Sequence, residues 1–159
     1  MTSSLSTPLG ELFLTSNEEG IRLVNFSSGR GIDEHLSRLH RSFRRQLKEY
    51  FEGKRRVFDL GIDLNGTPFQ NEVWKLTSRI PFGETRTYRE IAEQLGDWKK
   101  SRAVGLALGA NPILVVVPCH RVIGEDGGMH GYAAETWRKQ WLLNHEYSII
   151  SGQLDLFKR

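Results

Sequence analysis

The sequence predicts an α+β fold, with a small N-terminal subdomain of β-sheet and helix and a mostly helical C-terminal subdomain. Three observations support this prediction. Apolar and polar residues alternate on both sides of "NEEG" at 17–20, apolar residues recur at helical spacing over most of the later chain, and the turn "NGTP" at 65–68 separates the two patterns. We therefore expect an N-terminal subdomain over 1–64, a C-terminal subdomain over 65–150, and a tail over 151–159 that no pattern assigns.

Composition and charge are those of a soluble globular protein. Of 159 residues, 38% are hydrophobic and 26% are charged, and no apolar run approaches the roughly 20 residues of a membrane span. Since "MTSSLSTPLG" lacks the basic and apolar regions of a signal peptide, we expect a cytoplasmic protein. The single cysteine excludes an internal disulfide and a multi-cysteine metal site. Lys and Arg number 22 against 19 acidic residues, an excess that permits a nucleic-acid partner without requiring one.

The N-terminal part predicts a hairpin, a helix and a further strand. The hairpin strands lie near 11–15 and 21–26. The helix spans "DEHLSRLHRSFRRQLKEYFEGK", where Asp33 can cap the start and Gly53 can end it. Its apolar face is formed by Leu36, Leu39, Phe43, Leu47 and Tyr50. The segment "RRVFDLGIDL", residues 55–64, is predicted to be another strand.

The C-terminal part is predicted to begin with three helices. The first covers 68–80 and begins with a proline, which is favoured in the first turn. The second, "TYREIAEQLG", is short, with Thr87 or Thr85 as its cap and Gly96 as its stop. The third, "SRAVGLALGAN", is also short, and Ser101 can cap it.

The two short helices, joined by a tight turn with basic residues, are typical of a helix-turn-helix. An ordinary helical pair is the alternative. Small residues crowd the second of these helices: Gly105, Ala107, Gly109 and Ala110. Because the two glycines lower helix propensity, we expect the small residues to allow a close approach, either to a narrow groove or to a tightly packed backbone.

The segment "ILVVVPCHRVIG", residues 113–124, contains the cysteine. Its apolar run predicts a buried strand that ends at a proline and is followed by Cys119, His120 and Arg121. A free cysteine is commonly a small buried hydrophobe, and that role is the alternative to a reactive thiol. His120 does not decide between the two, because adjacent strand residues point to opposite faces.

A carboxylate lies on the helix predicted over 135–146. Glu146 partly shares a face with Leu142 and Leu143, and a carboxylate on an apolar face is costly unless it is hydrogen-bonded. A solvated helix end is the alternative. Together with Cys119 and His120, Glu146 would complete a set of nucleophile, base and orienting carboxylate.

The stretch "NPILVVVPCHRVIG" resembles the active-site signature of the O6-alkylguanine-DNA alkyltransferases, the methylated-DNA–protein-cysteine methyltransferases. The Pro-Cys-His-Arg-Val run at 118–122 is its most specific part. The resemblance extends through "TPFQNEVWKLTSRIPFGETRTYREIAEQLG", "SRAVGLALGANP" and "GYAAETWRKQWLLNHE", so it covers 68–146, and the N-terminal hairpin resembles the family more loosely.

This resemblance implies a DNA-repair activity. It implies irreversible, single-turnover transfer of the alkyl group from O6-alkylguanine, and less well from O4-alkylthymine, in double-stranded DNA to Cys119. It also implies base flipping, minor-groove binding by a winged helix-turn-helix-like unit, and a ribonuclease-H-like N-terminal subdomain. No cofactor, metal or membrane partner is expected. The protein should act as a monomer, associated with the nucleoid if its source is a prokaryote.

The resemblance assigns catalytic roles as well. Cys119 would accept the alkyl group, and His120 would be its base, acting through a water. Glu146 would hold the histidine, and Asn111 would fix the turn between the recognition helix and the active-site strand. Because a thiolate is the reacting species, we expect the pKa of Cys119 to be lowered.

Substrate and DNA contacts follow from the same resemblance. Tyr88 would contact the flipped base, and Arg102 would fill the space that the base leaves in the stack. The substrate pocket would include Tyr132, Ala133 and Val122. Further DNA contacts are expected from Lys100, Ser101, Ala103 and Gly105.

The pocket loop departs from the family, since Ala134 and Glu135 stand where two glycines are usual, which affects the size of alkyl group accepted. Two other functions compete with repair. An alkyltransferase-like protein that only binds alkylguanine would lack the acceptor cysteine, which is present here as Cys119. A helix-turn-helix regulator with a redox-sensing thiol would explain the cysteine but not Glu146.

Overall fold

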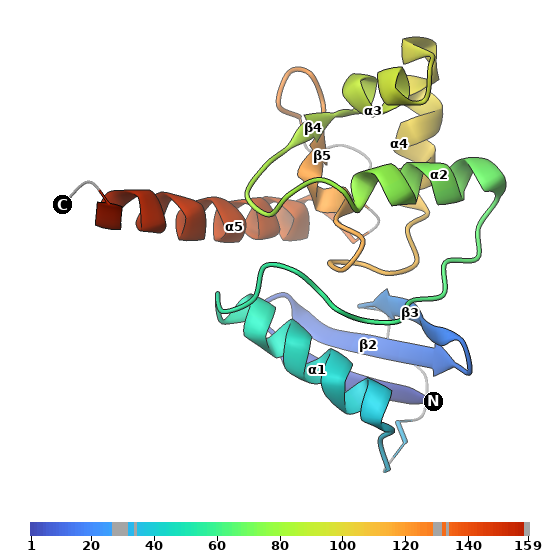
Figure 1. Cartoon of the computed structure of the whole chain (residues 1–159), viewed down its shortest axis with the longest axis vertical. Coiled ribbons are helices and arrows are strands. Elements are labelled where there is room, and N and C mark those ends of the chain that lie inside the picture. The colour runs from blue at the N-terminus through green and yellow to red at the C-terminus, as the bar shows by residue number, and fades with distance from the viewer. Residues whose placement is uncertain (27–31, 34, 129–131, 133, 158–159) are drawn as a thin grey trace. The chain divides into compact units, whose positions relative to one another are not determined.

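The computed structural model describes residues 1–26, 32–33, 35–128, 132 and 134–157 (Figure 1). The chain forms two compact units. One consists of Met1–Asn65 with Pro112–Val116, and the other of Gly66–Asn111 with Val117–Arg159.

The first unit contains a three-stranded antiparallel sheet in the order β1-β2-β3. Its strands are β1 (Thr2–Thr7), β2 (Gly10–Asn17) and β3 (Gly20–Asn25). The predicted hairpin is confirmed as β2 and β3, whereas β1 was not predicted. Helix α1 (Arg38–Phe51) packs against the sheet (Figure 1). Leu12, Leu14, Val24, Phe43 and Leu47 are fully buried in this unit.

The start of α1 differs from the prediction. Ser37 is the N-cap, and its side chain accepts a hydrogen bond from the backbone N–H of His40. Asp33 lies too far upstream to cap the helix, and its Oδ2 instead accepts a hydrogen bond of 2.6 Å from the N–H of Thr2. The carboxylate therefore ties the first strand to the segment before the helix.

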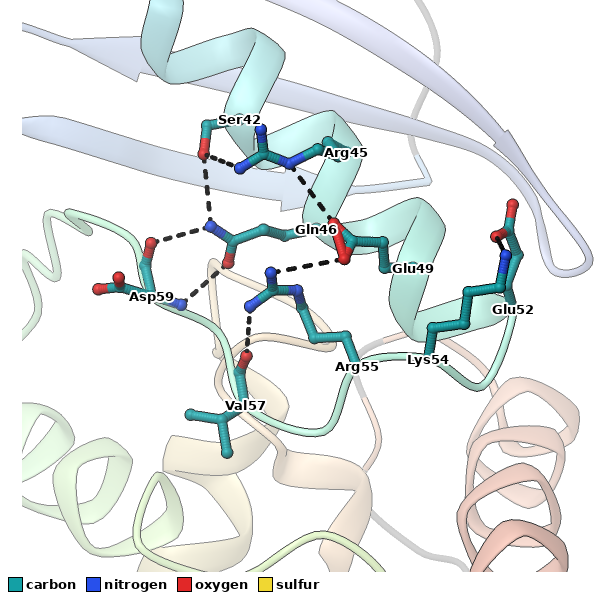
Figure 2. Close-up of polar contacts among 9 residues, drawn as sticks. All are labelled: Ser42, Arg45, Gln46, Glu49, Glu52, Lys54, Arg55, Val57 and Asp59. Carbon is teal, nitrogen blue, oxygen red and sulfur yellow. Dashed lines mark hydrogen bonds and ion pairs between the residues drawn. The ribbon is translucent and has the colours of Figure 1, made fainter.

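The prediction of a strand over 55–64 is wrong. Only Ile62 makes a bridge, to Ile21, within this segment. The side-chain amide of Gln46 on α1 donates to the carbonyl of Asp59 at 3.0 Å and accepts from its N–H at 2.9 Å (Figure 2). This amide takes up backbone hydrogen bonds that a neighbouring strand would otherwise supply.

The prediction of a strand over 113–117 is also wrong, although the segment is largely buried. Ile113 bridges Val24, and the chain then turns sharply. The N–H of Val116 donates to the carbonyl of Leu114 at 2.8 Å, and Val115 between them has φ +71°. A turn of this kind with positive φ is rare and strained. The apolar run therefore predicted correctly that this segment is buried, but it did not predict its conformation.

The second unit consists of several short helices and strands and one long C-terminal helix (Figure 1). Its helices are α2 (Pro68–Thr77), α3 (Tyr88–Gln94), α4 (Ser101–Gly109) and α5 (Thr136–Phe157), with 3₁₀ turns η1 (Trp98–Lys100) and η2 (Cys119–Arg121). Strands β4 (Arg86–Thr87) and β5 (Val122–Ile123) pair in parallel. None of the helices in the described part of the chain is long and apolar enough to cross a membrane.

The caps of the two short helices were predicted with mixed success. Thr87 caps α3, accepting from the N–H of Glu90 at 3.1 Å, and Gly96 follows the helix with φ +96°. Ser101 is the first residue of α4 and not its cap, because its hydroxyl donates to the carbonyl of Trp98 at 2.6 Å. Helix α5 continues to Phe157, past the predicted end at 146.

Candidate active site

Cys119 opens the 3₁₀ turn η2, and its side chain is 2% exposed. The N–H of Cys119 donates to the carbonyl of Val117, and that of Arg121 to the carbonyl of Pro118. With three residues per turn, consecutive side chains of a 3₁₀ helix point about 120° apart. Cysteine, histidine and arginine can therefore follow one another directly and still reach different partners.

Asn111 holds the thiol from the end of α4. Its Nδ2 donates to Cys119 Sγ and to the carbonyl of Val117, both at 2.9 Å. The same side chain thus fixes the backbone before the cysteine and contacts the sulfur itself. The site lies in the second unit, to which Asn111, Val117 and Cys119 all belong.

His120 is fully buried and contacts Glu146 of α5. Its Nε2 lies 2.7 Å from Glu146 Oε2. Because an ionised carboxylate only accepts hydrogen bonds, Nε2 carries the proton and Nδ1 has a free lone pair. Nδ1 is buried, and no described residue is its hydrogen-bond partner. The imidazole is thus held in the tautomer that a general base requires.

Glu146 is 1% exposed, which excludes the alternative of a solvated helix end. Arg121 donates to both carboxylate oxygens, from Nε at 2.8 Å and from Nη2 at 3.0 Å, and the N–H of Gly83 donates at 3.2 Å. Burial alone would raise the pKa of Glu146, but the hydrogen bonds from His120 and Arg121 and the guanidinium charge hold it well below its usual range. Glu146 is therefore an ionised anchor at the centre of the site.

Burial acts on the two reactive groups in opposite directions. It lowers the pKa of His120, against the hydrogen bond and charge of Glu146, so the imidazole is neutral at pH 7. It raises the pKa of Cys119 to about 11, against the hydrogen bond from Asn111 and the charge of Lys139. The expectation of a lowered thiol pKa is wrong, because desolvation outweighs the polar contacts. The resting sulfur is a thiol that needs a base.

Lys139 is a buried cation that the sequence reasoning missed. It is 1% exposed, and its Nζ donates to the carbonyl of Val122 at 2.6 Å and to the hydroxyl of Tyr88 at 3.3 Å. Burial lowers the pKa of Lys139 to about 8. The available signal was its position three residues before Leu142 and seven before Glu146, on the buried face of α5.

The predicted substrate residues lie in different settings. Tyr88 is half-buried, and burial raises its pKa to about 12, so its hydroxyl is a hydrogen-bond donor at neutral pH. Val122 is buried on β5. The hydroxyl of Tyr132 is buried without a hydrogen-bond partner among the described residues. Ala133 lies outside the described residues.

The predicted DNA contacts lie on α4 and η1. Lys100, Arg102 and Ala103 are exposed, whereas Ser101 and Gly105 are half-buried. A Cβ added to Gly105 would meet only the Tyr88 ring, at 3.9 Å, which is ordinary contact. Packing within the protein therefore does not require this glycine. Ala107 differs, since it is buried and its carbonyl accepts from Trp74 Nε1 at 2.8 Å.

Comparison with known proteins shows the family to which the chain belongs. The sequence profile of the 6-O-methylguanine DNA methyltransferase DNA binding domain matches residues 68–148, and that of the ribonuclease-like domain matches residues 1–64. The methylated-DNA–protein-cysteine methyltransferase of Methanosarcina acetivorans is 45% identical over 148 residues, which cover 89% of this chain and 95% of that protein.

Solved structures are similar over nearly the whole chain. The O6-methylguanine methyltransferase of Mycobacterium tuberculosis has a TM-score of 0.82 at 38% identity, covering 99% of both chains. The same organism's OGT in complex with DNA has a TM-score of 0.81 at 40% identity, covering 93% of both chains. By its sequence and its fold, the chain belongs to the 6-O-methylguanine DNA methyltransferase family.

Proposed function

We propose that this protein repairs DNA by taking the alkyl group of O6-alkylguanine onto the sulfur of Cys119. The observation that carries the proposal is a buried thiol held by Asn111, followed directly by a histidine that Glu146 fixes in its basic tautomer. The names of the curated relatives, methylated-DNA–protein-cysteine methyltransferases, support the same reaction.

Binding begins at the helix-turn-helix. The exposed face of α4 carries Arg102 and Ala103 beside small residues that leave room for DNA, and the DNA complex of the M. tuberculosis relative supports such a partner. The alkylated base must leave the duplex, at a cost of a few kcal/mol. Arg102 fills the vacated stack, and Lys100, Ser101 and Gly105 contact the DNA around it.

The flipped guanine then lies between Tyr88, Val122, Ala133 and Tyr132. His120 Nδ1 accepts the thiol proton through a water as Sγ attacks the alkyl carbon. The bond from that carbon to O6 breaks, and its electron pair leaves with the guanine. Tyr88 donates a proton to the guanine anion, and Lys139, 3.3 Å away, replaces it. The half-buried Tyr88 and the buried Lys139 thus pass a proton to the base without leaving an isolated charge in the site.

The product is a thioether, and a thiolate is a poor leaving group from an alkyl carbon. Each molecule therefore reacts once. O4-alkylthymine presents the same alkyl–oxygen bond on a smaller base and should react less well. We further propose that the protein works as a cytoplasmic monomer.

The test is to incubate the protein with a duplex carrying one O6-methylguanine and to measure the protein's mass. Repair predicts that the mass rises by one methylene group, that the label maps to Cys119, and that Cys119→Ala abolishes transfer while binding persists. Binding without a mass change in the wild type would indicate an alkyltransferase-like protein. A thiol that is oxidised but never alkylated would indicate a redox-sensing regulator.

A further inference from the structure

Helix α1 carries a row of cations on its exposed side. Arg38, Arg41, Arg45 and Lys48, hereafter the α1 basic stripe, are all exposed. Their spacing of three, four and three residues places them on one helix face. The opposite face is buried through His40, Phe43, Gln46, Leu47 and Tyr50. At 1.5 Å per residue, the stripe is about 15 Å long.

The stripe lies in the most basic part of the chain. Residues 38–56 contain eight Lys and Arg and two Glu, although the whole chain has a net charge of only +3. Residues 86–102, which include the helix-turn-helix, contain five Lys and Arg and three acidic residues. The largest excess of positive charge is therefore outside the unit expected to bind DNA.

The neighbouring carboxylates do not neutralise the stripe. Glu49 lies between Arg45 at 3.4 Å and Arg55 at 3.5 Å, as Figure 2 shows. Glu52 is likewise shared between Lys48 at 4.0 Å and Lys54 at 3.1 Å. Each carboxylate thus faces two cations, and exposed pairs of this kind are weak enough to exchange partners.

At the other end of the stripe, no acidic side chain in the described ranges pairs with Arg38 or Arg41. The guanidinium of Arg41 donates to the carbonyl of Leu36 at 2.8 Å. This contact orients the side chain, and no carboxylate of the described residues compensates its charge. The N-terminal half of the stripe is therefore the part most available to an anion.

We propose that the α1 basic stripe binds the phosphate backbone of double-stranded DNA, as a second contact besides α3 and α4; this inference rests on the proposed function for its choice of partner. One strand presents a phosphate every 3.4 Å along the axis, so about 15 Å of helix faces about four phosphates. Three of the four side chains are arginines, which bind phosphate oxygens bidentately.

Other polyanions fit this helix less well. A helix that binds a membrane surface inserts an apolar face into it, but the apolar face of α1 is buried in its own unit. Phosphate contacts read no sequence. The stripe therefore provides affinity for undamaged DNA and keeps the protein on the duplex between lesions.

The test compares two full-length variants, each with three exposed charges removed. R41Q/R45Q/K48Q removes most of the stripe, and R22Q/K75Q/R79Q is the matched control on other exposed positions. Affinity for an undamaged duplex is measured over a range of salt concentrations. The stripe variant should bind at least about tenfold more weakly at low salt, and its salt slope should fall by about 0.9 for each phosphate that the variant no longer neutralises.

A stripe variant whose slope equals that of the wild type or of the control overturns the inference. So does a stripe-dependent loss of binding to vesicles containing phosphatidylserine while DNA binding is unchanged. The rate of alkylation by free O6-benzylguanine, which needs no DNA, checks that the variant is folded. If the triple variant does not fold, R38Q/R41Q, which breaks no ion pair among the described residues, is measured in its place.

Failure of the proposed repair function can be distinguished from failure of the inferred DNA contact. If wild-type protein gains no mass from O6-methylguanine DNA but the stripe variant still loses salt-dependent affinity, the repair assignment fails and the DNA contact stands. If transfer occurs but the slope is unchanged, the repair assignment stands and the DNA contact fails.

Discussion

At the scale of single residues, burial prepares a proton transfer between Cys119 and His120. It raises the pKa of the thiol to about 11 and lowers that of the imidazole. Both groups are therefore neutral in the resting site, which avoids the cost of an isolated buried charge. In the proposed reaction the pair becomes charged only as the sulfur attacks, with Glu146 already in place beside the imidazole.

His120→Ala should slow transfer at neutral pH and make the rate rise about tenfold per pH unit, because the thiolate fraction then limits the reaction. Wild-type transfer should stay constant at neutral pH and fall in acid only below the usual range for histidine, since the pKa of His120 is lowered. Single-turnover rates between acidic and neutral pH measure this. Glu146→Gln, which keeps the shape but not the charge, should give an intermediate loss. A pH-independent rate in the alanine variant would contradict the base assignment.

Lys139→Met should remove an alkaline limb of the pH profile. Wild-type transfer should decline as pH rises through about 8, where Lys139 loses its proton and can no longer replenish Tyr88. The methionine variant should be slower below that pH and show no decline there. Lys139→Arg is the matched control, because it keeps the charge but cannot give up a proton, so it should also lack the limb and be about as slow as the methionine variant. If the methionine variant showed the same decline of rate at alkaline pH, the decline would be caused by the titration of another group.

At the scale of elements, the loop after α2 sets the position of α5. Gly83 has φ +81°, and a Cβ there would lie 2.4 Å from Cγ1 of Ile150. Its N–H also donates to Glu146 at 3.2 Å. The loop therefore contacts α5 at a position where a residue with a Cβ would be strained.

Gly83→Ala should move α5 and slow transfer, because the shift displaces the carboxylate that orients His120. We expect a destabilisation of about 1–3 kcal/mol from overpacking. Ile150→Ala alone should change the rate little, and added to Gly83→Ala it should restore part of the rate. Rates and urea unfolding of the three variants test this. If the Gly83→Ala protein is less stable but fully active, Gly83 has a structural role and does not position the carboxylate of Glu146 for the reaction.

Arg102 on α4 allows a test of the helix-turn-helix. Its side chain is exposed, as a wedge for the vacated stack requires. Arg102→Ala should slow repair of duplex DNA far more than reaction with free O6-benzylguanine, which needs no flipping. Lys99→Ala should instead weaken DNA binding in a salt-dependent way. Equal losses on both substrates would place Arg102 in the pocket or in the structure.

Whether an element could be predicted from the sequence depended on whether it is set by contacts near to it in the sequence or by contacts distant from it. The cap Thr87 is local, and it was one of the two caps predicted for α3. The turn at Val115 was not, because it is set by pairing with Val24, which is distant in sequence. Strand β1 was missed because "TSSLST" has few apolar residues and is defined mainly by its pairing with β2.

The site shows the same limit. The resemblance singled out Asn111, Cys119, His120 and Glu146, and the structure joins them in two hydrogen-bonded pairs, Asn111 with Cys119 and His120 with Glu146. Lys139 was missed because a lysine in a helix is usually solvated. The raised pKa of Cys119 was missed as well, because the sequence gives the polar neighbours but cannot weigh their contacts against burial.

At the scale of the whole molecule, the chemistry of one sulfur is coupled to long-range packing. The site joins Gly83, the turn η2 and Glu146 of α5, which are far apart in the sequence. Cys119 is 2% exposed at the centre of these contacts, so its alkylation changes the volume of a packed interior. Alkylation also adds a carbon group to the sulfur that Asn111 Nδ2 contacts at 2.9 Å.

We therefore expect the alkylated protein to unfold at a lower temperature than the unmodified protein. Overpacking by a methyl group costs about 1–3 kcal/mol, and a domain of this size loses about 2–4 °C for each kcal/mol. A benzyl group should lower the melting temperature further. Thermal unfolding before and after stoichiometric reaction with free alkylguanine, so that no DNA is present, measures the change. Cys119→Ala exposed to the same reagent should show no shift. If the alkylated protein melts at the same temperature, the pocket has room for the group, and strain does not distinguish the spent protein from the active one.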